Sequence, residues 1–494
     1  MIEPTAKQLA IIQAQERRVV VDAAVGSGKT FVLTERIRYY IHESAVEPAR
    51  ILAVTFTRRA ARELKTRLVD IPHGDEVWAG TLHAWCAEVL HRWGYLCGYP
   101  RFLIIDEDDA KFIKHGIEQE TGGGLTEYFS TLRKYRAIDF AGLENLTLYM
   151  LKNRPEVLRW VLDSWRYVFV DEAQDLNPAQ WEIVEYLAQN CTEETQRRLT
   201  IIGDSCQSIY GWRGVRVERF KREEGARYTL NENFRSAAGI ITRINRLMDS
   251  NPYQPEPIVA MSGRDAPYSM QTASNTRHMG GSSAILCRTQ RDIRKVEQEL
   301  DDHSIEHFRL GRKRFTEQTD VKLAINLWRL VLDPECELPY LIDSAESLDR
   351  HKEIDTFAGL LTVAAERALA YQGLGDLTAW FTANNVSLTD RIVDHRGLLD
   401  ELILSGGDDE NDPAGIAVGT VHTAKGMEWN SVFVYNFIEG VFPHNLSKRG
   451  DDRWWQMEEE RRVAYVAITR ARDRVILHLP EGKTQSRYVK ELGT

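Results

Sequence analysis

Residues 17–41 read RRVVVDAAVGSGKTFVLTERIRYYI, and the fold is organised around this stretch. It opens with an apolar run at residues 19–21, which suits a buried strand of a parallel sheet. A turn of small residues follows at 23–30, and apolar side chains then recur at helical spacing through residues 33–41. A strand, a glycine-rich turn and a helix in this order predict a phosphate-binding loop, in which backbone amides and a helix N-terminus attract phosphate oxygens.

The GKT end of this loop carries its two most informative side chains. Lys29 is predicted to reach the β- and γ-phosphates of ATP, and the Thr30 hydroxyl is predicted to bind Mg²⁺. Ala23 stands where such loops usually begin with glycine. The loop residues expected to contact the nucleotide are Ala24, Val25, Gly26, Ser27, Gly28, Lys29 and Thr30.

The composition is that of an ordinary globular chain. Its 494 residues are 43% hydrophobic and 28% charged, and this length allows several domains, each with its own core. No apolar run reaches the length of a membrane span, and the N-terminal residues lack the features of a secretory signal. The six cysteines contain no CxxC pair, which argues against a zinc site or a disulfide framework. We therefore predict a cytoplasmic protein without a membrane partner.

The net charge of −10 limits how the chain could bind nucleic acid. A surface that is acidic overall does not attract polyanions, so any nucleic-acid site must be a local groove. Basic clusters occur at residues 58–67, 213–222 and 309–314, although each could equally be the solvated face of a helix.

A second apolar run, at residues 167–170, ends in the acid pair Asp171 and Glu172. Asp171 is predicted to hold Mg²⁺, usually through water, and Glu172 to orient and deprotonate an attacking water molecule. Two acids at a strand end are often structural, but their combination with a phosphate loop favours catalysis. A further run, at residues 199–202, leads to Gln207, which could sense the γ-phosphate of ATP.

Aromatic rings, hydroxyls and arginines follow several of the predicted strands. Phe56 and Thr57 follow the apolar run at residues 51–54, and an exposed ring there could stack on a nucleobase, although Phe56 could also belong to the core. Tyr210 and Trp212 follow another strand and are also placed to stack on bases. Because ligand sites in parallel sheets lie at the carboxyl ends of the strands, these residues predict a nucleic-acid site close to the nucleotide.

Eight motifs occur in one order along the chain: AAVGSGKT, AVTFTRRAA, GTLHAW, VFVDEAQD, GDSCQSIYGWRG, LNENFRSAAGI, VGTVHTAKGMEW and EEERRVAYVAITRARDRV. Together they resemble the UvrD/Rep/PcrA group of superfamily 1 DNA helicases, and the resemblance spans nearly the whole chain. It implies an α/β fold with two RecA-like P-loop domains built on parallel sheets, each carrying a short, mainly helical insertion. It also implies that ATP and Mg²⁺ bind between the two domains.

The resemblance divides the chain into six segments. The first RecA-like domain is expected at residues 1–90 and 161–222, with its helical insertion at 91–160. The second is expected at residues 223–335 and 413–494, with a reduced helical insertion at 336–412. Apolar runs independently predict a second parallel sheet, with strands near residues 284–287, 416–418, 432–434 and 475–477.

Further residues gain roles from the resemblance. Gln8 is expected to hydrogen-bond the adenine edge, Phe234 to stack on the adenine and Glu428 to contact the ribose. Arg235 and Arg470, from the second domain, would neutralise the γ-phosphate as the domains close, although each alone could be a surface ion pair. The implied catalytic set is Lys29, Asp171, Glu172, Gln207, Arg235 and Arg470. The implied DNA-binding set is Phe56, Thr57, Thr81, His83, Tyr210, Trp212, Arg213, Thr420 and His422.

The resemblance implies a motor that uses ATP to move 3′→5′ along single-stranded DNA and to unwind duplexes, in DNA repair or replication. Its partners would be single-stranded DNA and junctions of single and double strands, and the chain would be a monomer or a weak oligomer. Relatives usually carry a larger second insertion. The alternative is therefore a DNA-stimulated regulatory ATPase that needs a partner such as a nuclease, or a chain that acts mainly as a single-strand translocase. The full set of hydrolysis residues disfavours a module that binds nucleotide without hydrolysing it.

Overall fold

The computed structural model describes residues 3–121, 124–189, 197–249, 251–253, 256–264, 270–273, 282–311, 415–448 and 453–493. The chain forms two compact units. The larger unit consists of Met1–Thr81, Arg159–Gly311 and Pro413–Thr494, and the smaller unit of Leu82–Leu158 and Arg312–Asp412. The reduced insertion predicted at residues 336–412 lies outside the described residues.

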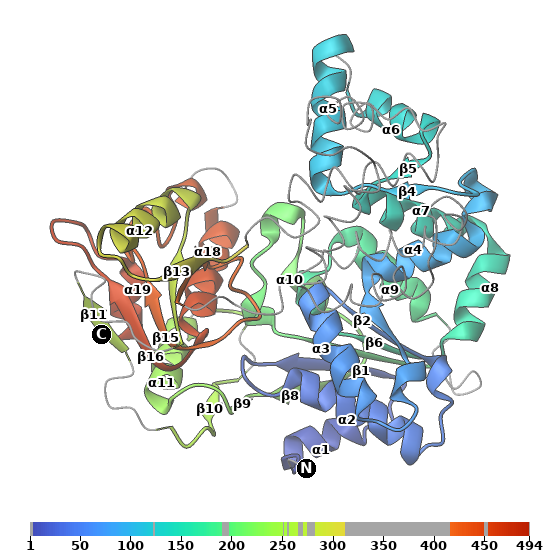
Figure 1. Cartoon of the computed structure of the whole chain (residues 1–494). Helices are drawn as coiled ribbons and strands as arrows, with labels where there is room; N and C mark the ends of the chain where they lie inside the picture. Colours follow the sequence, from blue (N-terminus) through green and yellow to red (C-terminus); the bar gives the residue numbers. More distant parts are fainter. Residues whose placement is uncertain are drawn as a thin grey trace, which may run out of the picture. The chain divides into compact units, whose positions relative to one another are not determined.

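The first sheet of the larger unit has six parallel strands in the order β3-β2-β6-β7-β1-β8, of which Figure 1 labels β1, β2, β6 and β8. The strands are β1 (Arg18–Ala23), β2 (Ile51–Thr55), β3 (Trp78–Thr81), β6 (Tyr167–Val170), β7 (Arg198–Gly203) and β8 (Ala226–Leu230). The four inner strands are the apolar runs predicted from the sequence. β3 and β8 were not predicted, because edge strands lack the continuous apolar run of a strand with a neighbour on each side.

Helices cover one face of this sheet, and the phosphate loop connects the inner strand β1 to one of them. α1 (Ala6–Ile12), α2 (Lys29–His42) and α3 (Arg58–Val69) share a hydrophobic core with side chains from the strands. α9 (Pro178–Leu187) begins with Pro178 as its first helical residue, and Asn177 caps it by accepting the Gln180 N–H. The larger unit also contains α10 (Val217–Lys221) and the short strand pair β9 (Glu232–Asn233) and β10 (Val259–Ala260).

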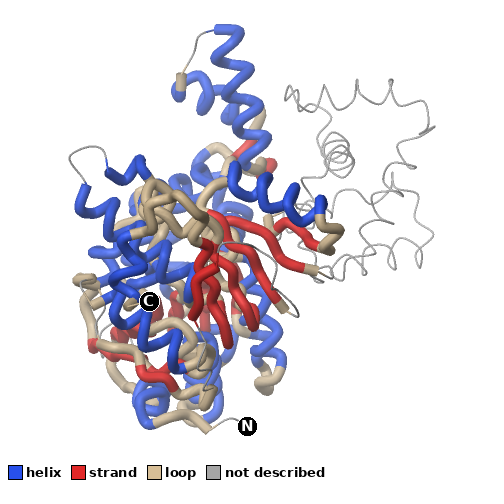
Figure 2. The backbone as a smooth tube through the Cα atoms, turned by 90° about the vertical axis from the view of Figure 1, so that its left-hand side faces the viewer, coloured by secondary structure: helices blue, strands red, loops and turns tan. Residues whose placement is uncertain are grey.

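The second sheet of the larger unit also has six parallel strands, in the order β11-β16-β15-β12-β14-β13. They are β11 (Met270–Ala273), β12 (Ser283–Cys287), β13 (His307–Arg309), β14 (Ile416–Thr420), β15 (Trp429–Val434) and β16 (Ala471–His478). One face is covered by α11 (Ala238–Met248), α18 (Arg453–Ile468) and α19 (Arg487–Leu492), and the other by α12 (Gln290–Asp302). Figure 2 shows helices in blue packed beside strands in red. The predicted α/β class with parallel sheets is confirmed.

The described part of the smaller unit is mainly helical. Its helices are α4 (Leu82–Trp93), α5 (Glu107–Thr121), α6 (Leu125–Lys134), α7 (Phe140–Asn153) and the start of α8 (Pro155–Ser164). Its short strand pair, β4 (Leu103–Ile104) and β5 (Ala137–Ile138), was not predicted from the sequence. The unit begins at Leu82, earlier than the boundary expected at residue 91. In the described part of the chain, no helix has the length and hydropathy needed to cross a membrane.

Candidate active site

The phosphate loop connects β1 to α2 and is held from both sheets. Gly26 and Gly28 have φ angles of +66° and +81°, a region of backbone space that favours glycine. A Cβ on Gly26 would lie 2.7 Å from Asn233 Nδ2, so the loop is closely packed there. Asn233 Nδ2 donates a 2.7 Å hydrogen bond to the Val25 carbonyl, and the Val25 side chain is buried in the core around the second sheet. The second sheet's core therefore helps to hold the loop.

Lys29 begins α2 and faces an acid at the end of the neighbouring strand β7. Its Nζ lies 3.9 Å from Asp204 Oδ2 and 3.5 Å from the Ala23 carbonyl oxygen. Burial raises the pKa of Asp204, although the charge of Lys29 opposes that rise. Both distances are long for a charge-assisted hydrogen bond, so phosphate oxygens could replace these partners at the ammonium group.

The acid pair predicted from the sequence follows β6 directly. Burial and the charge of Glu172 raise the pKa of Asp171 to about 7. Burial alone would raise the pKa of Glu172 as well, but nearby cations, chiefly Lys29 and Lys425, outweigh it and lower this pKa. Gln174 Nε2 also donates a 2.6 Å hydrogen bond to Glu172 Oε2. Glu172 is therefore the more readily ionised member of the pair, as a proton acceptor must be.

Gln207 connects the part of the site built on the first sheet, here called the first half, with the part built on the second sheet, here called the second half. Its Nε2 donates a 2.6 Å hydrogen bond to Asp204 Oδ2, and its Oε1 accepts a 3.0 Å hydrogen bond from Arg470 Nη2. Arg470 lies between α18 and β16, in the second sheet's half of the unit. A continuous chain of polar contacts therefore runs from Lys29 through Asp204 and Gln207 to Arg470.

The two predicted phosphate-binding arginines lie close to each other. Burial and the neighbouring charge of Arg235 lower the pKa of Arg470 to about 10. Arg235 Nε forms an ion pair with Glu428, the residue expected at the ribose. The two guanidinium groups repel each other, and an anion bound between them would relieve the repulsion. The pair is therefore suited to a phosphate group.

The residues expected at the adenine and the ribose lie around the same loop. Gln8 Nε2 donates a 3.0 Å hydrogen bond to the Ser27 carbonyl, and Gln8 Oε1 accepts one of 3.0 Å from the Thr5 N–H. Both ends of the amide are thus used within the protein in this conformation. The backbone N–H of Phe234 donates to the Gly26 carbonyl, and its ring is 40% exposed. These contacts hold Gln8 and Phe234 beside the phosphate loop.

The site suits Mg²⁺ bound mainly through water and phosphate. No group of three or more His, Cys, Asp or Glu side chains within the described ranges could hold a metal ion. Mg²⁺ keeps several of its waters and usually takes only one or two carboxylates together with substrate phosphates. One hydroxyl, from Thr30, and one carboxylate, from Asp171, have the composition of such a site, and the binding of Mg²⁺ by these two residues stays a prediction.

Lys425 is a member of the site that the sequence analysis did not single out. It follows β14, and its Nζ forms an ion pair with Asp175 and donates a 2.6 Å hydrogen bond to the Gln207 carbonyl. Both side chains of the ion pair are buried. A lone cation in the turn after an apolar strand was the only signal in the sequence, and nothing there identified its acidic partner.

Replacing Lys425 by methionine is expected to destabilise the larger unit. Burial already raises the pKa of Asp175 to about 6, and without Lys425 that carboxyl would lose its main compensating cation. Loss of one member of a buried ion pair should lower the melting temperature at pH 7.5 by about 2 to 5 °C. Differential scanning fluorimetry measures this shift. The double variant Asp175→Asn/Lys425→Met should recover most of the loss, and an unchanged melting temperature in the single variant would contradict the assignment.

Three aromatic residues predicted to bind DNA lie side by side. The ring centroids of Phe56 and Tyr210 are 5.8 Å apart, and those of Tyr210 and Trp212 are 6.5 Å apart. Trp212 is 69% exposed, and the Arg213 guanidinium lies 4.8 Å from the centroid of its ring. An exposed indole beside a cation suits stacking on nucleobases along a phosphate backbone.

The other residues predicted to contact DNA are less exposed. The side chains of Thr81 and Thr420 are buried, and Thr420 Oγ1 accepts the Thr423 N–H at 3.1 Å. The His422 carbonyl accepts a 3.5 Å hydrogen bond from Tyr210 Oη. Burial and the charge of Arg288 lower the pKa of His422 to about 4, so its ring is neutral near pH 7. Their contacts with DNA stay predictions.

Thr57 and His83 have partners within the protein. Thr57 caps α3, because its Oγ1 accepts the Ala60 N–H at 3.2 Å. His83 Nε2 lies 2.8 Å from the buried Glu144 carboxylate within the smaller unit. A DNA phosphate would need to compete with Glu144 for that ring nitrogen.

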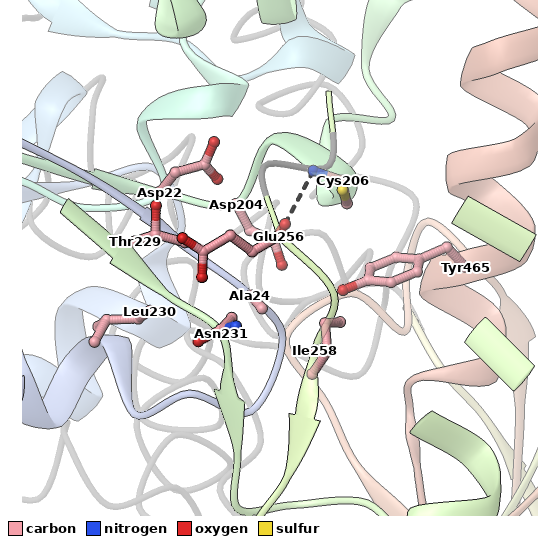
Figure 3. Close-up of a pocket in the computed structure, with 10 residues that line it drawn as sticks. All are labelled: Asp22, Ala24, Asp204, Cys206, Thr229, Leu230, Asn231, Glu256, Ile258 and Tyr465. Atoms are coloured by element: carbon pink, nitrogen blue, oxygen red, sulfur yellow. Dashed lines mark hydrogen bonds between the residues drawn. The ribbon is translucent and has the colours of Figure 1, made fainter. Parts of the chain in front are cut away.

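A small pocket lies next to the phosphate loop (Figure 3). Its lining includes Ala24 and Asp204, but neither Lys29 nor Thr30. The Cys206 N–H donates a 2.9 Å hydrogen bond to Asp204 Oδ1 at its edge. The pocket is therefore distinct from the place where the phosphates are expected.

Family models match most of the sequence from which this site is built. The model of the UvrD/REP helicase N-terminal domain matches residues 5–124 and 118–226, and that of the UvrD-like helicase C-terminal domain matches residues 387–481. Together they cover more than half of the chain. The chain belongs to the UvrD-like family of ATP-dependent DNA helicases.

Individual UvrD-like relatives match along nearly the full length. The chain is 26% identical to the ATP-dependent DNA helicase PcrA of Leuconostoc citreum, over 98% of this chain and 84% of that protein. It is also 26% identical to the PcrA protein of a Staphylococcus epidermidis strain and 25% identical to that of a Staphylococcus aureus strain, in each case over 98% of this chain and 86% of the relative.

Proposed function

We propose that this chain is an ATP-driven motor that moves 3′→5′ along single-stranded DNA and unwinds duplex DNA. The proposal rests on the chain of contacts from Lys29 through Asp204 and Gln207 to Arg470, because it connects the phosphate loop with an arginine from the other half. The direction of movement follows from similarity to the UvrD/Rep/PcrA group.

ATP hydrolysis at this site would depend on both halves. The nucleotide phosphates would replace Asp204 as the partner of Lys29 and would draw Arg235 and Arg470 onto the γ-phosphate. Mg²⁺ would neutralise part of the phosphate charge. Glu172 would orient the attacking water and accept its proton.

The same contacts offer a route from the nucleotide to the DNA. Gln207, Tyr210 and Trp212 lie on one short segment after β7, and Lys425 Nζ binds the Gln207 carbonyl from the second half. A change of partner at Gln207 would therefore move the rings proposed to stack on bases. Repeated closure and opening of the halves would pass the strand across these rings.

Strand separation by the purified chain tests this proposal. With ATP and Mg²⁺, a duplex carrying a 3′ single-stranded tail should be unwound, whereas the same duplex with a 5′ tail should remain paired. Unwinding of the 5′-tailed substrate alone would reverse the proposed direction. ATP hydrolysis without unwinding, restored by an added nuclease partner, would favour the regulatory ATPase that the sequence left as the alternative.

Replacing Trp212 by alanine is expected to weaken the binding of single-stranded DNA by about tenfold, because loss of one base–aromatic stack costs on the order of 1–3 kcal/mol. Fluorescence anisotropy with a labelled oligonucleotide at fixed salt measures the change. Trp212→Phe keeps a stacking ring and should retain most of the affinity. Trp454→Ala, which removes an indole that is 51% exposed on α18, serves as the matched control. Equal losses in the two alanine variants would contradict the specific role of Trp212.

A further inference from the structure

Arg472 lies beside the candidate ATP site, and the proposed function gives it no role. It is near the start of β16, two positions after Arg470. Its Nε donates a 3.0 Å hydrogen bond to Glu428 Oε1, and its Nη2 forms an ion pair with the same oxygen. Arg235 Nε pairs with the other carboxylate oxygen, Oε2. Glu428 therefore bridges two guanidinium groups.

Backbone hydrogen bonds fix the segments that carry these three side chains. The Ala237 N–H donates to the Arg472 carbonyl at 2.7 Å, and the Trp429 N–H donates to the Arg470 carbonyl at 2.9 Å. The turn that carries Arg235 and the loop that carries Glu428 are thus both hydrogen-bonded to the start of β16. The three charged groups are held together by the fold.

The Glu428 carboxylate, which lies between Arg235 and Arg472, is ionised. Burial would raise the pKa of Glu428, but Arg235 and Arg472 outweigh burial and lower it. Under the proposed function, Arg235 must leave Glu428 to reach the nucleotide phosphates. A carboxylate left without a cation would attract Arg235 back and would also repel the anionic nucleotide.

We propose that Arg472 is a positioning residue that holds and neutralises Glu428, and so frees Arg235 for the phosphates of ATP. This inference rests on the proposed function, because it requires ATP to bind at this site. Arg472 acts through Glu428 and needs no contact of its own with the nucleotide.

Steady-state ATP hydrolysis with saturating single-stranded DNA tests the role of Arg472. Arg472→Ala should raise the KM for ATP by about fivefold and leave kcat within about twofold, because it removes one partly exposed ion pair from the binding step. Arg472→Lys keeps the charge and should recover most of the loss. The matched control is Arg264→Ala, which breaks an ion pair with Asp473 on the same strand. The exposed fractions of the two arginine side chains are 42% for Arg264 and 41% for Arg472. The control should change neither constant.

A double-mutant cycle identifies the residue through which Arg472 acts. In a Glu428→Gln background, where the carboxylate charge is gone, Arg472→Ala should raise KM no further. Independent effects of the two substitutions would overturn the proposal, and so would a lower kcat with unchanged KM, which indicates a structural defect.

Binding of a fluorescent ATP analogue to the wild-type chain separates a failure of the proposed function from a failure of the role of Arg472. A wild-type chain that binds no nucleotide overturns both the proposed function and this inference. Normal wild-type binding with an unchanged KM in Arg472→Ala overturns the role of Arg472 alone.

Discussion

Replacing Lys29 by alanine is expected to lower kcat for DNA-stimulated ATP hydrolysis by about three orders of magnitude, because the phosphates lose the cation closest to the loop. The effect on folding should be small. Among the residues that the structure describes, the Lys29 ammonium approaches two oxygen atoms, and both distances are long: 3.9 Å to Asp204 and 3.5 Å to the Ala23 carbonyl. The neighbouring Asp204 carboxyl, whose pKa burial already raises, can take up a proton once the lysine is gone.

Phosphate release at saturating ATP and single-stranded DNA measures the loss in Lys29→Ala. The melting temperature and the affinity for the oligonucleotide should stay close to those of the wild type, which separates a catalytic defect from unfolding. Lys483→Ala removes an exposed lysine far from the loop in sequence and serves as the control. Retention of more than about a tenth of the wild-type rate in Lys29→Ala would contradict the role of Lys29 in stabilising the transition state.

Replacing Arg470 by alanine is expected to lower kcat by about a thousandfold, which is the low end of the range for arginine fingers in phosphoryl transfer. Arg470 is buried, and its guanidinium reaches Gln207 Oε1 of the first half. The substitution therefore removes both a cation and a connection between the halves. The affinity for single-stranded DNA should change much less, because Arg470 is not among the residues proposed to contact DNA.

Arg470→Lys distinguishes charge from geometry at this position. Lysine keeps the positive charge but cannot reproduce the planar fork of a guanidinium, so kcat should still fall by at least about tenfold. Gln207→Ala should also lower kcat, since it removes the partner through which Arg470 meets the first half. A wild-type rate in Arg470→Ala would show that hydrolysis needs no arginine from the second half at this position.

The sequence predicted the parts of the fold that depend on local chemistry. The phosphate loop needs glycines and a lysine at fixed spacing, and the inner strands β1, β2, β6 and β7 need continuous apolar runs. Each of these signals is contained within a short segment of the chain. The edge strands β3 and β8 were missed, because each has only one neighbour and a mixed composition.

The pairings between charged residues far apart in the chain could not be read from the sequence. Lys425 meets Asp175 across a separation of 250 residues, and Glu428 receives Arg235 on one oxygen and Arg472 on the other. Such pairings depend on how distant segments of the chain pack together, which no local pattern records. The sequence identified most of the charged residues at the site, but not which of them pair with each other.

Ser205 gives a second example of a pairing that only the fold reveals. Its hydroxyl lies 3.0 Å from Asp22 Oδ2 and 2.9 Å from the Tyr253 carbonyl oxygen. Asp22 is also paired with Lys221 at 2.6 Å. The serine therefore links the end of β1, just before the phosphate loop, to the segment that follows α11.

ATP hydrolysis is expected to require both halves of the site and to be governed by DNA bound along the rings that follow Gln207. The most direct measurement is the ATPase rate of the wild-type chain with and without saturating single-stranded DNA. DNA should raise this rate by about tenfold or more, because bound DNA favours the closed arrangement in which Arg235 and Arg470 reach the phosphates. An ATPase rate that is the same with and without DNA would contradict it.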